Sequence, residues 1–193
     1  MKVLGIETSG GIGGFALVDD TQLVAEEVAD IMGHHLERGS DMIESILTGA
    51  GLGVSDLEGI AVSLGPGSFT GLRVGLALAK GLAVGAGLAL AGVPTLDAIA
   101  EGLREAEGMV VVVRDARRGE VYFAAYRAGV GGLARLGPYR ALAPEAVAAE
   151  LAQEGALLGS ERPIVVAGDG LARYGDIFRR ALGGRAAFAA EPL

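Results

Sequence analysis

The sequence predicts an α/β fold made of two similar units, each in the order strand, strand, strand, helix, strand, helix. Each half opens with apolar segments separated by short turns, which is typical of antiparallel strands joined by hairpins. Each half then places one continuous apolar segment between two helical patterns, as a buried strand requires. Because this order occurs twice within 193 residues, we infer an internal duplication of architecture.

The first half is expected to form one unit over residues 1–100. Apolar residues such as Ile43 and Ile46 lie at helical spacing, and glycines from Gly49 to Gly53 end that pattern. The expected elements are strands at 3–8, 14–18, 23–28 and 59–64 and helices at 35–50 and 70–86.

The second half is expected to form a smaller unit over residues 101–193, after a linking helix near 96–108. Pro144 stands where a helix should begin, since proline suits the first helical turn. The expected elements are strands at 109–114, 120–127, 133–142 and 163–167, helices at 144–154 and 171–182, and a loop or tail at 183–193.

Composition narrows the function classes. The formal charge of −8 argues against a strong nucleic-acid binder, because such binding depends on Lys and Arg neutralising phosphates. The absence of cysteine excludes disulfides, thiolate catalysis and cysteine-based zinc sites. The first residues run directly into a strand pattern without the apolar region of a signal peptide, so we expect a cytoplasmic protein.

Residues 74–93 are almost entirely apolar or glycine and are about as long as a membrane-spanning helix. Lys80 would lie near the middle of such a span, at a cost of about 3 kcal/mol. The many Leu, Ala and Gly residues suit a helix packed between protein layers. We therefore expect no membrane association.

The most distinctive local motif is the loop at 65–73, between a buried strand and a helix. Gly65 and Gly67 allow positive φ angles, and Ser68 or Thr70 can cap the helix. The loop lacks the Gly-Lys-Ser/Thr ending of a Walker A motif. It is either a tight connection or a site that contacts an anion or a partner. The candidate contact residues are Gly65, Pro66, Gly67, Ser68, Phe69, Thr70 and Arg73.

The helix after this loop carries a stripe of small residues four positions apart. Such a stripe allows another element to approach closely, either the helix's own sheet or a second protein. We expect Val74, Leu78 and Leu82 to fill the core and the small stripe to face another surface. The predicted partner or dimer interface is Gly71, Val74, Gly75, Leu78, Ala79 and Leu82.

Two β-β-β-α-β-α units are the plan of the actin, hexokinase and Hsp70 superfamily, which this sequence resembles. That superfamily binds phosphates at the first hairpin turn of each unit. The corresponding residues, expected to form a vestigial cleft, are Glu7, Thr8 and Ser9 in the first half and Asp115, Arg117, Arg118, Gly119 and Glu120 in the second. The two histidines, His34 and His35, are adjacent and make a poor metal pair on a helix.

Four segments carry a closer resemblance. They are Leu4-Gly5-Ile6-Glu7-Thr8-Ser9, the loop motif Gly-Pro-Gly-Ser-Phe-Thr-Gly-Leu-Arg at 65–73, Gly92-Val93-Pro94-Thr95-Leu96, and Asp115-Ala116-Arg117-Arg118-Gly119-Glu120-Val121-Tyr122. In this order they resemble the bacterial TsaB (YeaZ) family of tRNA threonylcarbamoyladenosine biosynthesis subunits. The resemblance covers residues 1–125 closely and the remainder loosely, and Glu7 replaces the aspartate usual in that family.

The TsaB family is related to the catalytic subunit TsaD, historically called a glycoprotease. The metal-binding H-x-x-x-H pair of that subunit corresponds here to Thr95 and Ile99. Neither side chain can replace a neutral imidazole as a metal ligand. The resemblance therefore implies a catalytically inactive relative with no metal.

The resemblance implies a scaffold that binds and activates TsaD in the complex forming N6-threonylcarbamoyladenosine at position 37 of tRNAs reading ANN codons. It also implies an associated ATPase, TsaE, a homodimer when the chain is alone, and tRNA contact only through the complex. We expect no cofactor beyond weak binding of ATP or ADP. The alternatives are a small actin-like kinase or ATP-binding protein and, less favoured, a glycoprotease-like metallopeptidase.

Overall fold

The computed structural model describes residues 1–30, 35–157 and 163–189. These residues form two compact units, Met1–Thr95 and Leu96–Leu193, each described below by itself. The division falls five residues before the predicted boundary, because the linking helix α3 (Thr95–Glu101) packs with its apolar residues on the second unit.

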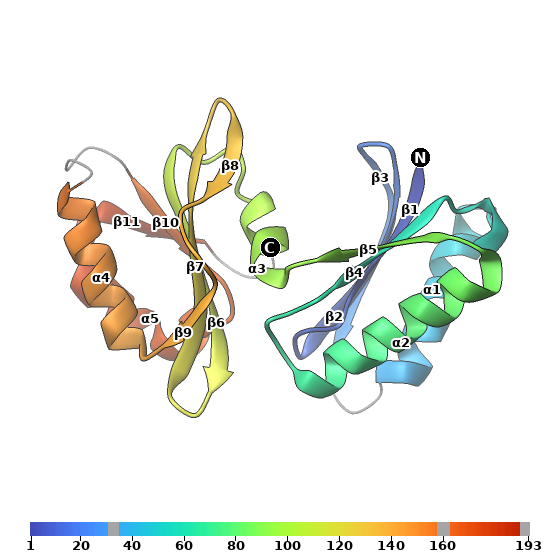
Figure 1. Cartoon of the computed structure of the whole chain (residues 1–193), viewed down its shortest axis with the longest axis horizontal. Coiled ribbons are helices and arrows are strands. Elements are labelled where there is room, and N and C mark those ends of the chain that lie inside the picture. The colour runs from blue at the N-terminus through green and yellow to red at the C-terminus, as the bar shows by residue number, and fades with distance from the viewer. Residues whose placement is uncertain (31–34, 158–162, 190–193) are drawn as a thin grey trace. The chain divides into compact units, whose positions relative to one another are not determined.

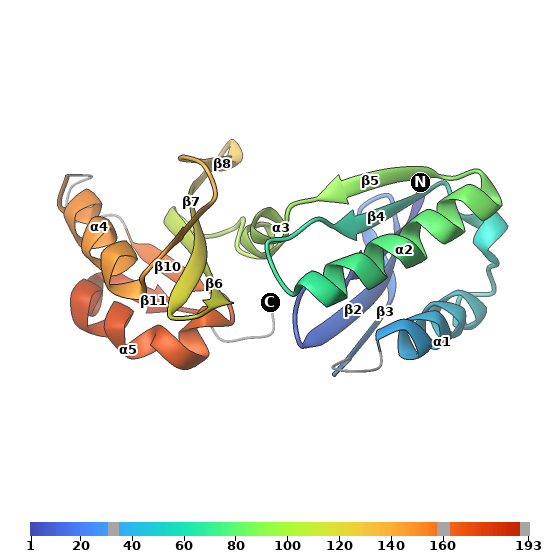
Figure 2. The same ribbon diagram turned by 60° about the horizontal axis from the view of Figure 1, so that its bottom comes forward.

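The first unit is a five-stranded mixed sheet in the order β3-β2-β1-β4-β5 (Figure 1). β1, β2 and β3 are consecutive antiparallel strands, whereas β4 and β5 run parallel to β1. Helices α1 and α2 cover one face of the sheet (Figure 2). The bounds are β1 Lys2–Glu7, β2 Ile12–Asp19, β3 Gln22–Asp30, α1 His35–Gly49, a 3₁₀ turn Val54–Asp56, β4 Gly59–Ser63, α2 Phe69–Ala86 and β5 Ala89–Val93.

The core of the first unit lies between its sheet and these two helices. Alternating residues of the strands point into it, as the period of two along a strand requires. Leu4 and Ile6 come from β1, and Phe15 and Leu17 come from β2, all at most 3% exposed. The short antiparallel hairpins thus follow directly from the alternating apolar pattern.

The second unit repeats this topology, with its sheet ordered β11-β10-β6-β7-β8 and β9 paired to β7. Its hairpin strands β6 and β7 are antiparallel. β10 pairs parallel with β6 on one side and parallel with β11 on the other. The bounds are β6 Gly108–Arg117, β7 Glu120–Gly129, β8 Gly132–Arg135, β9 Arg140–Leu142, α4 Pro144–Leu157, β10 Ile164–Ala167, α5 Gly170–Leu182, a 3₁₀ turn Gly183–Arg185 and β11 Ala186–Phe188.

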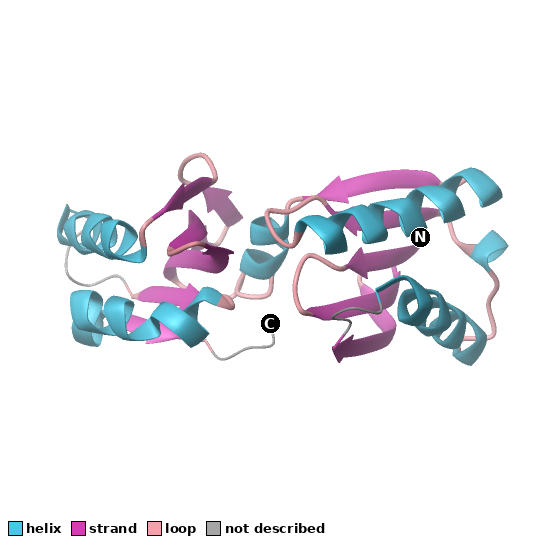
Figure 3. Cartoon of the chain, turned by 90° about the horizontal axis from the view of Figure 1, so that it is seen from below, coloured by secondary structure: helices cyan, strands magenta, loops and turns pink. Residues whose placement is uncertain are grey.

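Apolar clusters cover both faces of the second sheet. On one face, α4 and α5 pack on residues such as Val111 and Val113 of β6. On the other face, Leu96 and Ala100 of α3 pack on Val110, which is fully buried. Figure 3 shows the strands of this unit in magenta and its helices in cyan.

The duplicated actin-like fold class predicted from the sequence is confirmed, with three differences in detail. The tail expected at 183–193 contains β11, which pairs with β10, so the sheet of the second unit has six strands and that of the first has five. The strand expected at 133–142 is two strands, β8 and β9. The edge strand β5 was not predicted, because the apolar pattern of the preceding helix runs into it without interruption.

Helix α2 has the length and apolar composition of a membrane span, and 22% of it is buried in the structure. Its small residues Gly71, Gly75, Ala79 and Ala83 pack on the sheet of the first unit. The helix is therefore a layer of this unit, and its opposite side is exposed.

Candidate functional site

The turn after β1 lies at the carboxyl end of the strand. Thr8 and Ser9 are almost fully buried, at 0% and 1% exposure. The backbone N–H of Ser9 donates to the carboxylate of Glu7, which holds the turn in shape. In open α/β sheets, ligands bind outside the carboxyl ends of the strands, so this turn is in the expected place for a site.

The loop at 65–73 follows β4 and meets this turn within the first unit. Gly65 has a φ of +93°, a region that favours glycine, and the Gly65–Pro66 peptide is cis. The N–H of Thr95 donates to the carbonyl of Gly65 at 2.9 Å. The loop is therefore tied to the segment after β5 as well as to β4.

Contact between the loop and the turn is close and extends into α2. The N–H of Ser68 donates to the carbonyl of Ser9 at 2.7 Å. A side chain at Gly67 would overlap the backbone of Ser9, and one at Gly71 would overlap the carbonyl oxygen of Thr8. The glycines of the motif are thus needed where backbone approaches backbone.

The hydroxyl of Thr8 extends this contact by one turn of α2. Thr8 Oγ1 donates to the carbonyl oxygen of Gly71 at 2.9 Å, and it occupies the space that a Cβ at Gly75 would need. The small stripe of α2 therefore faces its own sheet. The prediction that this stripe faces another surface is wrong, because Thr8 fills the space beside it.

The other predicted interface residues are half-buried. Val74, Leu78 and Leu82 lie on the flanks of α2, where Leu78 contacts the α1 helix beside Gly39. Ala79 is fully buried with the small stripe. The exposed face of the helix is made of different residues, namely Arg73, Ala77, Lys80, Gly81 and Val84. An interface on α2 stays a prediction, and this face is where it would form.

The loop's capacity to bind an anion is limited by bonds that it makes itself. Ser68 caps α2, since its Oγ accepts from the N–H of Gly71 at 3.2 Å. The N–H of Ser68 is used by Ser9, as described above. Two amides that would face an anion are thus already paired. Anion binding by this loop stays a prediction.

Two large apolar side chains at the loop are exposed. Phe69 is 74% exposed and Leu64 is 55% exposed. The guanidinium of Arg73 lies 5.3 Å from the centroid of the Phe69 ring, which keeps the ring on the helix surface. Thr70 beside it is exposed, and Pro66 is half-buried. The loop therefore presents an aromatic side chain to solvent from a rigid base.

The second unit carries a matching arrangement at the turn between β6 and β7. Arg117 and Arg118 have positive φ angles of +66° and +54°, followed by Gly119 at +86°. Asp115 shapes the turn by accepting from the N–H of Arg117 at 2.8 Å. Both arginines, Gly119 and Glu120 are exposed. These residues lie in a different unit from Glu7, Thr8 and Ser9, so a common cleft stays a prediction.

An ion pair next to this turn, between a buried arginine and a half-buried aspartate, was not predicted from the sequence. Arg114 is 7% exposed, and its guanidinium donates to Asp169 at 2.9 Å and 3.2 Å. Asp169 also accepts from the N–H of Asp115 at 2.9 Å. A Cβ at Gly168 would overlap the carbonyl of Val113, just as Gly67 and Gly71 meet the end of β1 in the first unit. The two glycine turns each lie between a buried strand and a helix, and the pairing of the charges joins residues 55 positions apart.

A second unpredicted cluster holds α3 on the second sheet. Asp97 accepts from the hydroxyls of Tyr126 and Tyr139 at 2.7 Å and 2.6 Å. Arg135 lies 3.8 Å from the same carboxylate and over the Tyr139 ring. Burial, followed by the hydrogen bond to Asp97, raises the pKa of Tyr126. The cluster joins residues far apart in sequence, so no local sequence pattern predicts it.

No group of three or more His, Cys, Asp or Glu side chains is arranged to hold a metal within residues 1–30, 35–157 and 163–189. His34 lies outside the described residues, and His35 is the first residue of α1. Thr95 and Ile99, which correspond to the histidine pair of the catalytic subunit, lie at the start and in the middle of α3. Ile99 packs against the apolar cluster of the second unit.

Two units of one topology, each with a glycine turn packed on the end of its first strand, define an actin-like α/β protein. A sequence profile of the TsaD family, described as tRNA N6-adenosine threonylcarbamoyltransferase, matches residues 25–182. YeaZ from Pseudomonas aeruginosa has a similar structure, with a TM-score of 0.80 at 26% identity over 100% of this chain and 85% of that chain. The resemblance seen in the sequence is confirmed.

Two relatives are more similar in sequence, and both carry the name tRNA threonylcarbamoyladenosine biosynthesis protein TsaB. The protein of Bacillus subtilis (strain 168) is 34% identical over 72% of this chain and 60% of its own length. That of Escherichia coli (strain K12) is 38% identical over 69% of this chain and 58% of its own length. The matched region thus spans less than two thirds of either relative. The chain belongs to the TsaD family and, within it, is similar to the TsaB and YeaZ proteins.

Proposed function

We propose that the chain is a non-catalytic subunit of the complex that forms N6-threonylcarbamoyladenosine at position 37 of tRNAs reading ANN codons. In this role it binds and activates the catalytic subunit TsaD. The similarity to two tRNA threonylcarbamoyladenosine biosynthesis proteins supports the pathway. The net charge of −8 is consistent with tRNA contact made through the partners.

The non-catalytic role is supported by what stands at the histidine positions. Thr95 is 1% exposed, and its N–H is bound to Gly65. Ile99 is committed to apolar packing. A metal would need nitrogen, sulfur or carboxylate ligands from side chains that are free to reach it. Neither position supplies one.

The single observation that carries the partner role is the exposed face of α2. The small stripe packs on the chain's own sheet, so an apolar helix of 18 residues turns its other side outward. Val84 is 85% exposed there, between Lys80 and the C-terminal end of the helix. Phe69 stands at the other end. Apolar side chains beside a few basic ones on a rigid face are found at protein interfaces.

The same face would bind a second copy when the chain is alone, forming a homodimer. When TsaD is present, this face would bind TsaD instead. The ATPase TsaE would join through the assembled pair. We further propose that the chain uses no cofactor of its own and works in the cytoplasm.

The test pairs two exposed valines. Val84→Asp introduces a charge on the α2 face, whereas Val130→Asp introduces the same charge on the hairpin of the second unit, where Val130 is fully exposed. The full chain and its variants are mixed with purified TsaD from the same organism and analysed by sedimentation. We expect the unaltered chain and Val130→Asp to form a heterodimer with TsaD and Val84→Asp to lose it.

Each other outcome has a distinct meaning. Full assembly of Val84→Asp would reject the α2 face and keep the pathway role. Failure of the unaltered chain to bind TsaD, or to stimulate threonylcarbamoyl transfer to tRNA, would reject the proposed function. Equal melting temperatures for both variants would show that the comparison reports binding and not folding.

A further inference from the structure

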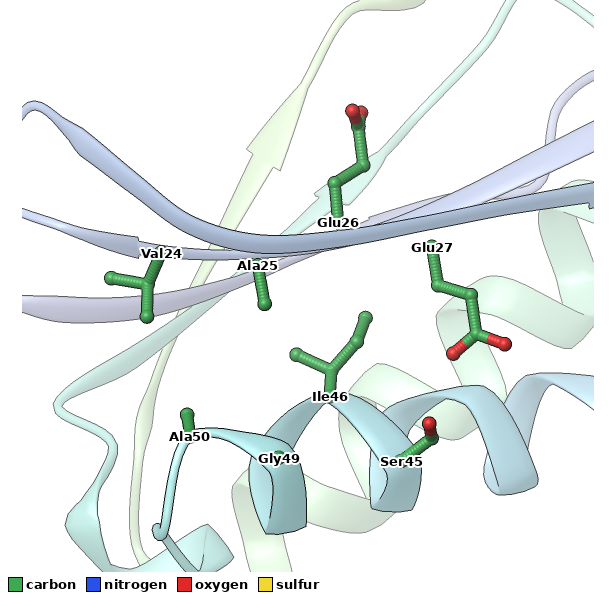
Figure 4. A pocket seen from close by; sticks show the side chains of 8 residues that line it. All are labelled: Val24, Ala25, Glu26, Glu27, Ser45, Ile46, Gly49 and Ala50. Atoms are coloured by element: carbon green, nitrogen blue, oxygen red, sulfur yellow. The ribbon is translucent and has the colours of Figure 1, made fainter.

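A groove of about 460 Å³ lies between the edge strand β3 and helix α1 in the first unit. Figure 4 shows its lining residues, with Ala25 and Glu27 of β3 directed toward α1 and Ile46 directed toward β3. Its residues are Val24, Ala25, Glu26, Glu27, Ser45, Ile46, Gly49 and Ala50. Polar and apolar groups line the groove in similar measure, and one carboxylate, that of Glu27, reaches into the opening.

β3 is a free edge of the first sheet. It pairs with β2 on one side, and no described strand pairs with its other side. The strand is nine residues long and contains no proline or lysine; its pairing with β2 has one register shift, opposite Leu17 and Val18, and its charged residues are all acidic. Its apolar residues Leu23, Val24 and Val28 are 55%, 48% and 50% exposed. Such an edge can add another extended strand.

The groove lies in an acidic unit. The unit Met1–Thr95 contains eleven acidic and four basic residues, and thus −7 of the chain's net charge of −8. Glu27 is half-buried at the groove, and no hydrogen bond or ion pair of Glu27 is present among the described residues. Glu26, its neighbour, points to the opposite face of the sheet (Figure 4). A partly desolvated carboxylate without a counter-charge favours a basic group beside it.

We propose that β3 and α1 form a docking site for an extended, basic peptide segment of a partner protein. The segment adds to the free edge of β3 through backbone hydrogen bonds. Its alternate side chains point toward α1, where an apolar one packs on Ile46 and Ala50 and a basic one pairs with Glu27. This site is built from elements other than the exposed face of α2, and it does not depend on the proposed function.

The probe is a fluorescently labelled nine-residue peptide, in which valine and lysine alternate on one face and threonine occupies the other. Two control peptides replace lysine by glutamate or carry a methyl group on every backbone nitrogen. Binding to the full chain is measured by fluorescence anisotropy at low salt. We expect saturable binding of the first peptide, at least tenfold weaker binding of the glutamate peptide, and none of the methylated one, because it cannot pair with a strand edge.

Two pairs of variants locate the site. Glu27→Gln should weaken binding about fivefold, the loss of roughly 1 kcal/mol for a partly exposed ion pair, whereas Glu26→Gln should change it less than twofold. Gly49→Leu should fill the groove and weaken binding at least tenfold. A Cβ at Gly49 meets no atom within 4 Å, and the same is true of Gly81 on α2, so Gly81→Leu is the matched control.

Three results would overturn the proposal. The first is the absence of saturable binding of the lysine peptide at millimolar concentration. The second is an equal effect of the two glutamine variants or of the two leucine variants. The third is a dimer of the chain alone that Gly49→Leu dissociates, since a second copy would then occupy the groove. Unchanged melting temperatures would establish that Gly49→Leu acts on binding alone.

Discussion

The side chain of Thr8 fills the space that a side chain at Gly75 would need. Thr8 lies at the end of β1 and is fully buried, and its hydroxyl donates to the carbonyl of Gly71 one turn earlier in α2. The helix can approach the strand this closely only because both contact positions are glycine. The glycine stripe is therefore a packing device within the first unit.

Gly75→Ala should destabilise the protein. The added Cβ overlaps Thr8 Oγ1, and overpacking a well-packed site costs about 1–3 kcal/mol. Gly81→Ala is the matched control in the same helix, since its Cβ would meet open space. There the change should raise the free energy of unfolding by about 0.5–1 kcal/mol, because glycine is a poor helix residue. Urea unfolding of both variants decides between these signs.

Thr8→Ala should rescue Gly75→Ala in part. Alone, Thr8→Ala should cost about 1 kcal/mol for the lost hydrogen bond. In the double variant the overlapping hydroxyl is gone. The nearest remaining atom is the Cβ of residue 8, which lies 3.3 Å from the new Cβ at residue 75. The double variant should thus be more stable than the sum of the single effects predicts. Strict additivity would mean that the two residues do not interact.

Asp169→Asn should lower stability by about 2 kcal/mol, because the carboxylate accepts charge-assisted bonds from Arg114 and a backbone bond from Asp115. Asp176→Asn, which breaks the exposed pair with Arg179, should cost about 0.5 kcal/mol or less. Thermal unfolding of the two variants compares the same chemical change in an ion pair with a buried arginine and in an ion pair whose partners are both exposed. Equal shifts would contradict the structural role of Asp169.

Stability should fall when the pH rises above about 10. Burial, the hydrogen bond to Asp97 and the charge of Asp97 raise the pKa of Tyr126 in the folded state. The unfolded chain loses the same proton near pH 10, so the contribution is fully present below that pH and declines above it, by up to about 1.4 kcal/mol per pH unit. Denaturant titrations from pH 8 to 11 measure the slope. Tyr126→Phe should reduce that slope, and an unchanged slope would contradict the assignment.

Phe69→Ala should leave the unfolding free energy within about 0.5 kcal/mol, since the ring is 74% exposed. Phe178→Ala, at a ring with 0% exposure, should cost about 3–5 kcal/mol. If the loop contacts a partner, Phe69→Ala should weaken TsaD binding at least tenfold. Unchanged binding would leave the loop with its structural role at the end of β4.

The elements that could be predicted are those whose signal is local. The hairpins of β1, β2 and β3 follow from alternating apolar residues and short turns, and α2 follows from its length and the cap at Ser68. β5 and β11 were not predicted, for a physical reason. Both are short edge strands of small residues, and their only support comes from parallel pairing with strands distant in sequence.

The candidate site was found from its motif, but its orientation was not. A stripe of small residues shows that some element approaches α2 closely, and it does not identify that element. Only the fold reveals that Thr8, 63 residues before Gly71, is the neighbour. Likewise, Asp97 meets Tyr126 and Tyr139 only because α3 crosses the second sheet.

The sequence by itself determined the duplicated α/β plan, the family resemblance and the rigid loop at 65–73, because each depends on residues close together along the chain. The tertiary structure decided which face of α2 is buried, which charges are paired and where an open groove remains. Those outcomes depend on long-range packing, such as the contact of Thr8 at the end of β1 with Gly71 and Gly75 of α2.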